Sequence, residues 1–192
     1  MFGQNIYGQL GLGDTNDRLT PTLIPKSSYD NKEIKEVKGD VRSSGILTKD
    51  GSLYVFGYNG FGQLGLGDNT NRLVPTLLPA SYYGNKTIKQ FELYYYCLSI
   101  LTTNNSLYTA GKNDDGALGL GDTNHRSTPT LVDSSTYENK IIRELCSGDE
   151  KLTLITTDEK VYSCGINNSG QLGNGHNNMT TSLALNTVID NL

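Results

Sequence analysis

Residues 57–68 read GYNGFGQLGLGD, and versions of this stretch recur at a constant spacing along the chain. GQNIYGQLGLGD starts at Gly3, GKNDDGALGLGD at Gly111 and GINNSGQLGNGH at Gly165, so each copy begins 54 residues after the one before. No insertion or deletion interrupts these steps. Self-similarity at such a period is typical of solenoids and propellers, in which each repeat is one supersecondary unit.

Positions outside the glycine-rich stretch keep the same step. We expect the recurrent leucines to fill the core, the glycines at Gly3, Gly57, Gly111 and Gly165 to permit tight backbone turns, and the recurrent arginines to hold the following loops. The leucines are Leu10, Leu64, Leu118 and Leu172, and the arginines are Arg18, Arg72 and Arg126. The chain is therefore read as one domain, 1–192, with repeats at 2–55, 56–109, 110–163 and, in part, 164–192.

Each period contains four short segments rich in β-branched and aromatic residues, which favour strands. The expected first strands are 34–38, 88–93 and 142–146, the second 44–48, 98–102 and 152–156, and the third 53–56, 107–110 and 161–164. Fourth strands are expected after prolines at 22–24, 76–78 and 130–132, and one more near 182–186. Lys49-Asp50-Gly51 predicts a hairpin. Asn104-Asn105 and Asp158-Glu159 take its place without glycine, so we expect a less demanding turn there. Four strands and a glycine motif per unit predict an all-β chain built of propeller blades.

The motif G-x-N-x-x-G-Q-L-G-x-G-D with a downstream R-x-x-P resembles the repeats of the regulator of chromosome condensation superfamily, and among its members the alpha-tubulin suppressor-like repeat proteins. The resemblance covers essentially the whole chain. It implies a β-propeller of four-stranded blades, of which this chain would be about three and a half blades of a seven-bladed ring. Three alternatives follow and stay open: a homodimer that closes a seven-bladed ring, a fragment of a longer chain, and an open arc.

Two features differ from the family pattern. Family repeats carry a histidine before the second strand, and this chain has Ser43, Cys97 and Lys151 there. The family's namesake is a nucleotide exchange factor for the small GTPase Ran, but its loop residues find no match here. Since functions are grafted onto folds, the resemblance says more about fold than about exchange activity.

Composition excludes several classes of protein. The 192 residues carry a net charge of −4 without a basic cluster, so no nucleic-acid partner is expected. No apolar run is long enough to span a membrane, and we expect no membrane partner. Three cysteines without C-x-x-C spacing form neither a disulfide framework nor a zinc site. With no secretory signal at the start, they favour the cytoplasm, with the nucleus left open.

The chemical motifs predict no enzyme, catalytic residue, metal or cofactor. GLGD lacks the lysine and serine or threonine of a phosphate-binding P-loop. The loops that follow it end in arginine, where a calcium loop would have a bidentate glutamate. We therefore expect Asx turns, each pinned by its own Asp–Arg pair. His125 and His176 have no ligand-spaced partner, and no G-x-S-x-G elbow is present.

Positions that vary within this constant frame are the candidates for recognition. The candidate partner-binding residues are Tyr7, Phe61 and Asp115 at loop tips and the run Tyr94, Tyr95 and Tyr96. Exposed aromatic side chains are enriched in protein interfaces, although packing within a loop would explain the tyrosine run equally well. The function predicted is a non-enzymatic protein-interaction module that binds another protein through its loop tips. An exchange factor for a Ran-like GTPase and an enzyme inhibitor remain alternatives, the latter because a bacterial β-lactamase inhibitory protein uses loop aromatics of such a propeller.

Overall fold

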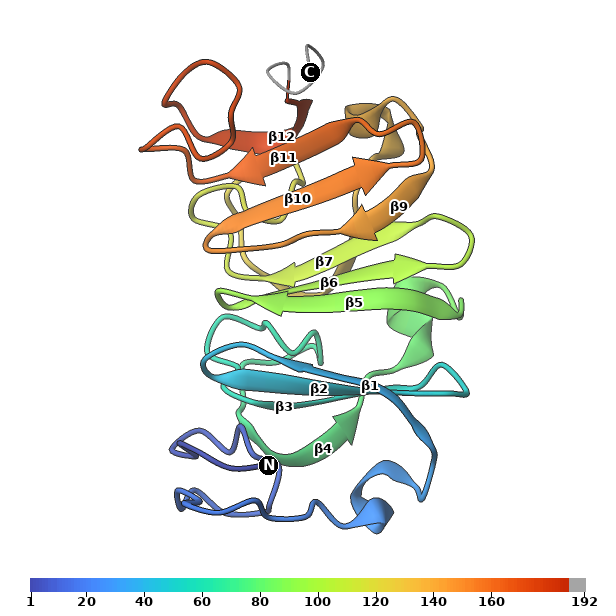
Figure 1. The fold of residues 1–192 in the computed structure, drawn as a ribbon, viewed down its shortest axis with the longest axis vertical. Helices are drawn as coiled ribbons and strands as arrows, with labels where there is room; N and C mark the ends of the chain where they lie inside the picture. The colour runs from blue at the N-terminus through green and yellow to red at the C-terminus, as the bar shows by residue number, and fades with distance from the viewer. Residues whose placement is uncertain (187–192) are drawn as a thin grey trace.

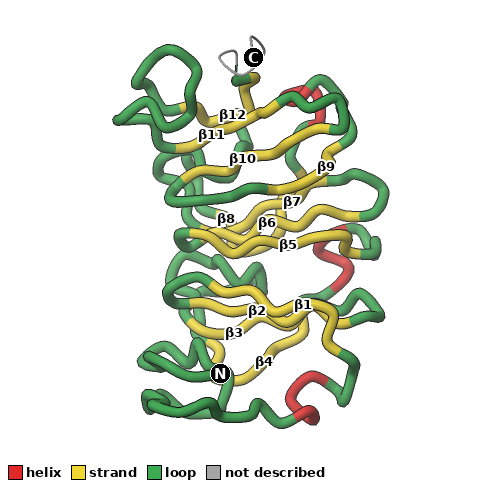
Figure 2. The backbone as a smooth tube through the Cα atoms, in the orientation of Figure 1, coloured by secondary structure: helices red, strands yellow, loops and turns green. Residues whose placement is uncertain are grey.

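The computed structural model describes residues 1–186 and places them in three four-stranded antiparallel sheets. The sheets lie one above another along the long axis in chain order, with the N-terminus at the lower end (Figure 1). Residues 1–186 contain short 3-10 helices but no α-helix (Figure 2). The predictions of an all-β chain and of four-stranded blades are confirmed. Part of the last predicted repeat, residues 187–192, lies outside the described residues.

The strands of each sheet are neighbours in the order in which they occur along the chain. The first sheet contains β1 (Ile34–Gly39), β2 (Ser43–Thr48), β3 (Leu53–Gly57) and β4 (Arg72–Leu77). The second contains β5 (Ile88–Tyr94), β6 (Cys97–Thr102), β7 (Leu107–Gly111) and β8 (Arg126–Leu131). The third contains β9 (Ile142–Leu145), β10 (Lys151–Thr156), β11 (Val161–Gly165) and β12 (Thr180–Leu185). The 3-10 helices are η1 (Lys26–Tyr29), η2 (Ala80–Tyr83) and η3 (Ser134–Tyr137).

The fourth strands differ from the prediction. β4 begins at Arg72, before its proline, and not after it. Val55 pairs with Thr76 and Gly57 with Arg72, so the register shifts around Pro75. A proline cannot donate to a ladder, and this irregularity on the outer strand accommodates it. The prediction of a strand at 22–24 is wrong, because these residues form no strand. Within residues 1–24, Met1 and Thr22 exchange two backbone hydrogen bonds, and Gly3 forms an isolated bridge with Arg18.

The hairpins between second and third strands also correct the prediction. The turn has the same conformation in all three sheets, because its central residue has a left-handed backbone even where it is not glycine. The φ angles are +86° at Gly51, +68° at Asn105 and +65° at Glu159. In each turn the backbone N–H of this residue donates to a threonine carbonyl at 3.0 Å, namely Thr48, Thr102 and Thr156.

The sheets pack face to face through apolar residues of successive blades. The predicted core leucines, Leu10, Leu64, Leu118 and Leu172, are all buried. Phe91 of β5 lies so close to Gly45 of β2 that a Cβ at Gly45 would be 2.6 Å from its ring. Val37 occupies the position of Phe91 one repeat earlier and is 46% exposed, whereas Phe91 is fully buried. Val37 of β1 is therefore exposed, whereas its equivalent in β5 is covered by the preceding sheet.

Candidate functional site

The glycine-rich loops that follow β3, β7 and β11 lie on one side of the stack, the left side in Figures 1 and 2. Each loop is organised around one fully buried asparagine. Asn59 Oδ1 accepts a hydrogen bond from Leu64 N at 2.8 Å, and Asn59 Nδ2 donates to Asp68 O at 2.9 Å. The equivalent asparagines are Asn5, Asn113 and Asn167. Sequence reasoning assigned these residues no role, although their recurrence at the third position of every copy was the available signal.

Aspartate and arginine side chains close the same loops. Asp68 Oδ1 accepts a hydrogen bond from Thr70 N at 2.8 Å, which forms an Asx turn, and Arg72 Nη2 donates to Asp68 Oδ2 at 2.6 Å. The pairs Asp14–Arg18 and Asp122–Arg126 have the same geometry. The predicted Asx turns and Asp–Arg pairs are confirmed. The loops thus hold their tips in fixed positions on that side of the sheets.

Five aromatic residues, here called the aromatic cluster, meet on this side: Tyr7, Tyr58, Phe61, Tyr95 and Tyr96. Ring centroids are 4.9 Å apart for Tyr7 and Tyr58, 5.6 Å for Tyr58 and Tyr96, and 5.3 Å for Phe61 and Tyr96. Tyr95 follows at 5.0 Å from Tyr96. The structure therefore brings together four of the six predicted recognition residues from three separate segments of the chain. It adds Tyr58, which could have been predicted from the sequence because the residue at its position also varies between repeats.

Arg42, in the turn between β1 and β2, packs against this cluster. Its guanidinium carbon lies 5.2 Å from the ring centroid of Tyr7, 5.9 Å from that of Tyr58 and 5.3 Å from that of Tyr96. These distances are within the range of cation–π attraction. Within residues 1–186, the guanidinium donates no hydrogen bond and forms no ion pair. The rings, and no carboxylate, hold this half-buried cation.

A second cation, Lys112, lies at the junction of the second and third sheets. Lys112 Nζ is 4.8 Å from the ring centroid of Tyr95 and 3.2 Å from Glu150 Oε1. Burial is the largest influence on the pKa of Lys112 and lowers it, but the hydrogen bond to Glu150 and the nearby negative charges together outweigh burial, so the net shift is upward. A hydrogen bond to the same carboxylate raises the pKa of Tyr95. The charge of Lys112 is therefore neutralised within the protein.

Two predicted recognition residues lie outside the cluster. Tyr94 is 4% exposed, and its hydroxyl donates to Ala117 O at 3.1 Å. It belongs to the core, so its assignment to the binding surface is wrong. The reason is that Tyr94 is the last residue of β5 and faces inward, whereas the next two tyrosines form the turn. Asp115 is half-buried beside Lys112 and does not contact the rings of the cluster through any described interaction.

The backbone of Tyr95 and Tyr96 is unusual. Their φ angles are +29° and +63°, in a region that side chains other than glycine, asparagine and aspartate rarely occupy. Each such residue costs about 1–3 kcal/mol, and strain of this kind concentrates at functional sites. We therefore treat this turn, which holds two consecutive tyrosines in this conformation, as part of the candidate site.

A cavity of about 340 Å³ adjoins the cluster. It lies between the three turns that join the first and second strands of each sheet, and Arg42 and Tyr96 belong both to its lining and to the cluster's contacts. Its lining also includes Asp40, Val41, Leu93 and Asp149. The cluster therefore borders a recess that a side chain could enter.

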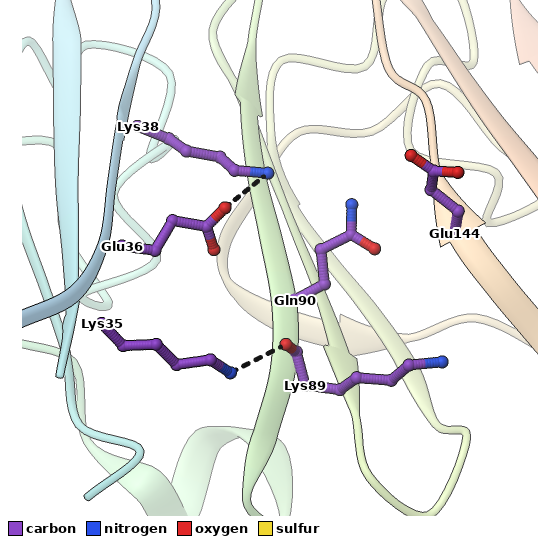
Figure 3. Close-up of a pocket in the computed structure, with 6 residues that line it drawn as sticks. All are labelled: Lys35, Glu36, Lys38, Lys89, Gln90 and Glu144. Carbon is purple, nitrogen blue, oxygen red and sulfur yellow. Dashed lines mark hydrogen bonds and ion pairs between the residues drawn. The ribbon is translucent and has the colours of Figure 1, made fainter. Parts of the chain in front are cut away.

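A larger groove, about 480 Å³, runs along the first strands of the sheets and is shown in Figure 3. Its lysines are already engaged with their neighbours. Lys35 Nζ donates to Lys89 O at 3.2 Å, and Lys38 Nζ lies 3.1 Å from Glu36 Oε1 (Figure 3). Lys89 Nζ reaches Ile142 O at 3.0 Å. The contacts of Lys35 and Lys89 join successive blades, so we regard the groove as structural.

Other kinds of site find little support among residues 1–186. No group of three or more metal-binding side chains occurs in this part of the chain. No helix in it is long and apolar enough to cross a membrane. The three cysteines are free, and burial raises the pKa of the Cys164 thiol to about 12, which keeps it protonated and unreactive.

Comparison with known proteins points to one family. Residues 1–39, 50–91 and 104–150 match the model of the regulator of chromosome condensation (RCC1) repeat. The chain is 34% identical over 176 residues to the ultraviolet-B receptor UVR8 of Arabidopsis thaliana, which is 92% of this chain but 39% of that receptor. Among solved structures, human WBSCR16 has a TM-score of 0.85 at 19% identity over 96% of this chain and 47% of that one. Yeast RCC1 (Prp20), crystallised with Kap60, has a TM-score of 0.79 at 20% identity over 96% of this chain and 43% of that one.

Proposed function

Because the chain belongs to the RCC1 repeat family, we propose that it is a non-enzymatic protein-binding module that docks its partner on the aromatic cluster and Arg42. One observation carries this proposal: five aromatic rings from three segments gather on one side, and three of them contact Arg42, which has no carboxylate partner within residues 1–186. Tyrosine and arginine are the residue types enriched in the hot spots of protein interfaces.

The surface is held in place before any partner arrives. The buried asparagines and the Asp–Arg pairs hold the glycine-rich loops, and the rings and Arg42 pack against each other. A preorganised surface loses less conformational entropy when a partner binds, which favours affinity. Such preorganisation supports a binding role for this surface.

The relatives support binding in general and leave the partner open. Yeast RCC1 was crystallised with Kap60 bound, and its likeness at 20% identity extends to the fold alone. The chain also spans about two fifths of the plant receptor's length, so that receptor's activity does not transfer. The exchange-factor and inhibitor alternatives have no residue of their own in this chain. They are therefore secondary to a general binding role.

The test is quantitative affinity capture with the whole chain. Tyr7→Ala combined with Phe61→Ala should abolish the recovery of proteins that wild type captures, because both rings belong to the cluster. Tyr82→Ala is the matched control, since Tyr82 is exposed in η2 and outside the cluster. Unchanged capture by the double variant, with an unchanged melting temperature, contradicts the proposal. Accelerated release of fluorescent GDP from a Ran-like GTPase would favour the exchange factor instead.

A further inference from the structure

We infer that Arg42 receives a carboxylate of the partner, so that the aromatic cluster selects an acidic segment with an apolar neighbour. This inference rests on the proposed function and names the partner's chemistry. It starts from a charge that residues 1–186 leave unpaired at the junction of the first two sheets. Within the described residues, the Arg42 guanidinium has three ring contacts and no acceptor.

The next junction provides an internal comparison. Lys112 is the repeat equivalent of Tyr58, and Glu150 is the equivalent of Tyr96. There the cation has both a ring, Tyr95, and a carboxylate from the following turn, Glu150. At the first junction the same turn position supplies Tyr96, which offers a ring and no carboxylate. The first junction thus has the cation and the rings but lacks the anion.

Asp40 does not supply the missing anion, although it is close in sequence to Arg42. Its Oδ1 accepts from the backbone N–H groups of Arg42 at 2.9 Å and Ser43 at 2.6 Å. Its Oδ2 accepts from Tyr96 N at 3.4 Å. Both oxygens therefore hold turns together, and no ion pair joins Asp40 to the guanidinium in the described part of the chain.

The surroundings of Arg42 fit a carboxylate. Guanidinium presents a planar fork of N–H donors that matches a carboxylate bidentately, and the rings fix its position in advance. The hydroxyls of Tyr7, Tyr58 and Tyr96 make no hydrogen bond to any other described residue, so they remain available as further donors. The adjoining 340 Å³ cavity, lined by Val41 and Leu93, accommodates an apolar side chain next to the acidic one.

Asp149 limits the charge that this ligand can carry. It lines the same cavity and forms no ion pair or hydrogen bond with another described residue. A second carboxylate placed in the cavity would meet this negative charge, and like charges brought together disfavour binding. The surface therefore fits one carboxylate at Arg42 beside an apolar residue, and not a run of acidic residues.

The experiment selects binders from a phage-displayed library of random peptides on the whole chain. Wild type should enrich peptides with Asp or Glu beside an apolar residue. Arg42→Gln should lose this enrichment while keeping the aromatic cluster. Arg143→Gln is the matched control, because its charge is paired with Glu159 and it lies outside the cluster, and it should keep the enrichment. Melting temperatures confirm that both variants fold.

The selected peptide is then compared with its Glu→Gln form by titration. Wild type should bind the glutamate form about tenfold more tightly, since hydrogen bonds to charged groups contribute this much, and Arg42→Gln should bind both forms equally. No enrichment, enrichment of basic peptides, or a preference that survives Arg42→Gln overturns the inference. Tighter binding of a phosphoserine form than of the glutamate form overturns it in favour of a phosphate. If cluster-dependent capture persists in any of these cases, the proposed function stands without the acidic ligand.

Discussion

Arg72 Nη2 lies 2.6 Å from Asp68 Oδ2, and the same distance joins Arg18 to Asp14 and Arg126 to Asp122. The three pairs occur at equivalent positions in three loops. In each pair, the arginine follows the aspartate by four residues. Each arginine also donates to a backbone carbonyl of its own loop, as Arg126 Nη1 does to Asn124 O at 2.7 Å. The pair therefore closes the loop on itself and fixes the direction in which the loop tip extends.

Breaking one Asp–Arg pair tests how much the pair contributes to the free energy of unfolding and how that contribution depends on pH. The hydrogen bond from Arg72 and the Thr70 N–H lower the pKa of Asp68 below its ordinary value. The stabilisation is therefore present above the pKa of the unfolded chain, near 3.8, and is lost as the pH falls through the lower folded value. Arg72→Ala should lower the free energy of unfolding by about 0.5 kcal/mol at neutral pH, because the pair is partly solvated. Urea unfolding should show this difference narrowing as the pH falls below 3.8.

The control for this pair is Arg143→Ala. Arg143 and Glu159 form an ion pair whose side chains are largely exposed, so its removal should change the stability less. An Arg72→Ala variant as stable as wild type at neutral pH would show that the loop does not depend on the pair.

The buried asparagine should matter more than the ion pair. Asn59→Ala leaves Leu64 N and Asp68 O without their side-chain partners in the interior of the loop. Each unsatisfied group costs about 1–3 kcal/mol, so we expect a loss of about 2–4 kcal/mol in chemical denaturation. Asn69→Ala, at an exposed position of the same loop, should have almost no effect. Equal effects of the two substitutions would contradict the role assigned to Asn59.

A glycine at Glu159 should stabilise the third sheet. Glu159 has a φ of +65°, where its counterpart Gly51 has +86°. A side chain in this left-handed region costs about 1–2 kcal/mol, part of which glycine recovers. Glu159→Gly should therefore raise the free energy of unfolding by about 1 kcal/mol, and Gly51→Ala should lower it by a similar amount. A neutral or destabilising Glu159→Gly, measured by urea unfolding, would show that the turn relaxes around the side chain.

The fold was largely predictable because its information repeats every 54 residues. A leucine or glycine that recurs at this spacing predicts the same structural position in each blade, and the strands could be located relative to these positions. The fourth strand was placed too late because the sequence shows a proline but not the register irregularity that admits it. At residues 22–24 the backbone pairing is limited to the two hydrogen bonds that Met1 and Thr22 exchange, which the sequence pattern does not reveal.

The candidate site was only half predictable, because its contacts join residues that no local pattern relates. Arg42 lies in a turn of the first sheet and stacks on Tyr96 from the second and on Tyr7 from an earlier loop. In the sequence, neither the position of Arg42 within its repeat nor its residue type distinguishes it from a solvent-exposed arginine. Tyr94 was misassigned for a related reason, since the direction of a side chain reverses where a strand passes into a turn.

The tyrosine run itself provides the sharpest test of which residues bind and which hold the fold. Tyr94→Asn removes a buried ring and its hydrogen bond to Ala117 O, so it should cost at least about 3 kcal/mol in unfolding free energy. Tyr96→Asn should change stability by less than about 1 kcal/mol, because asparagine tolerates the φ of +63° and this relief offsets the lost ring contacts. The same variant should lose affinity for captured partners, since Tyr96 contacts Arg42 and Phe61. If instead Tyr96→Asn destabilises the chain as much as Tyr94→Asn, the cluster is packing of the fold and not a surface for recognition.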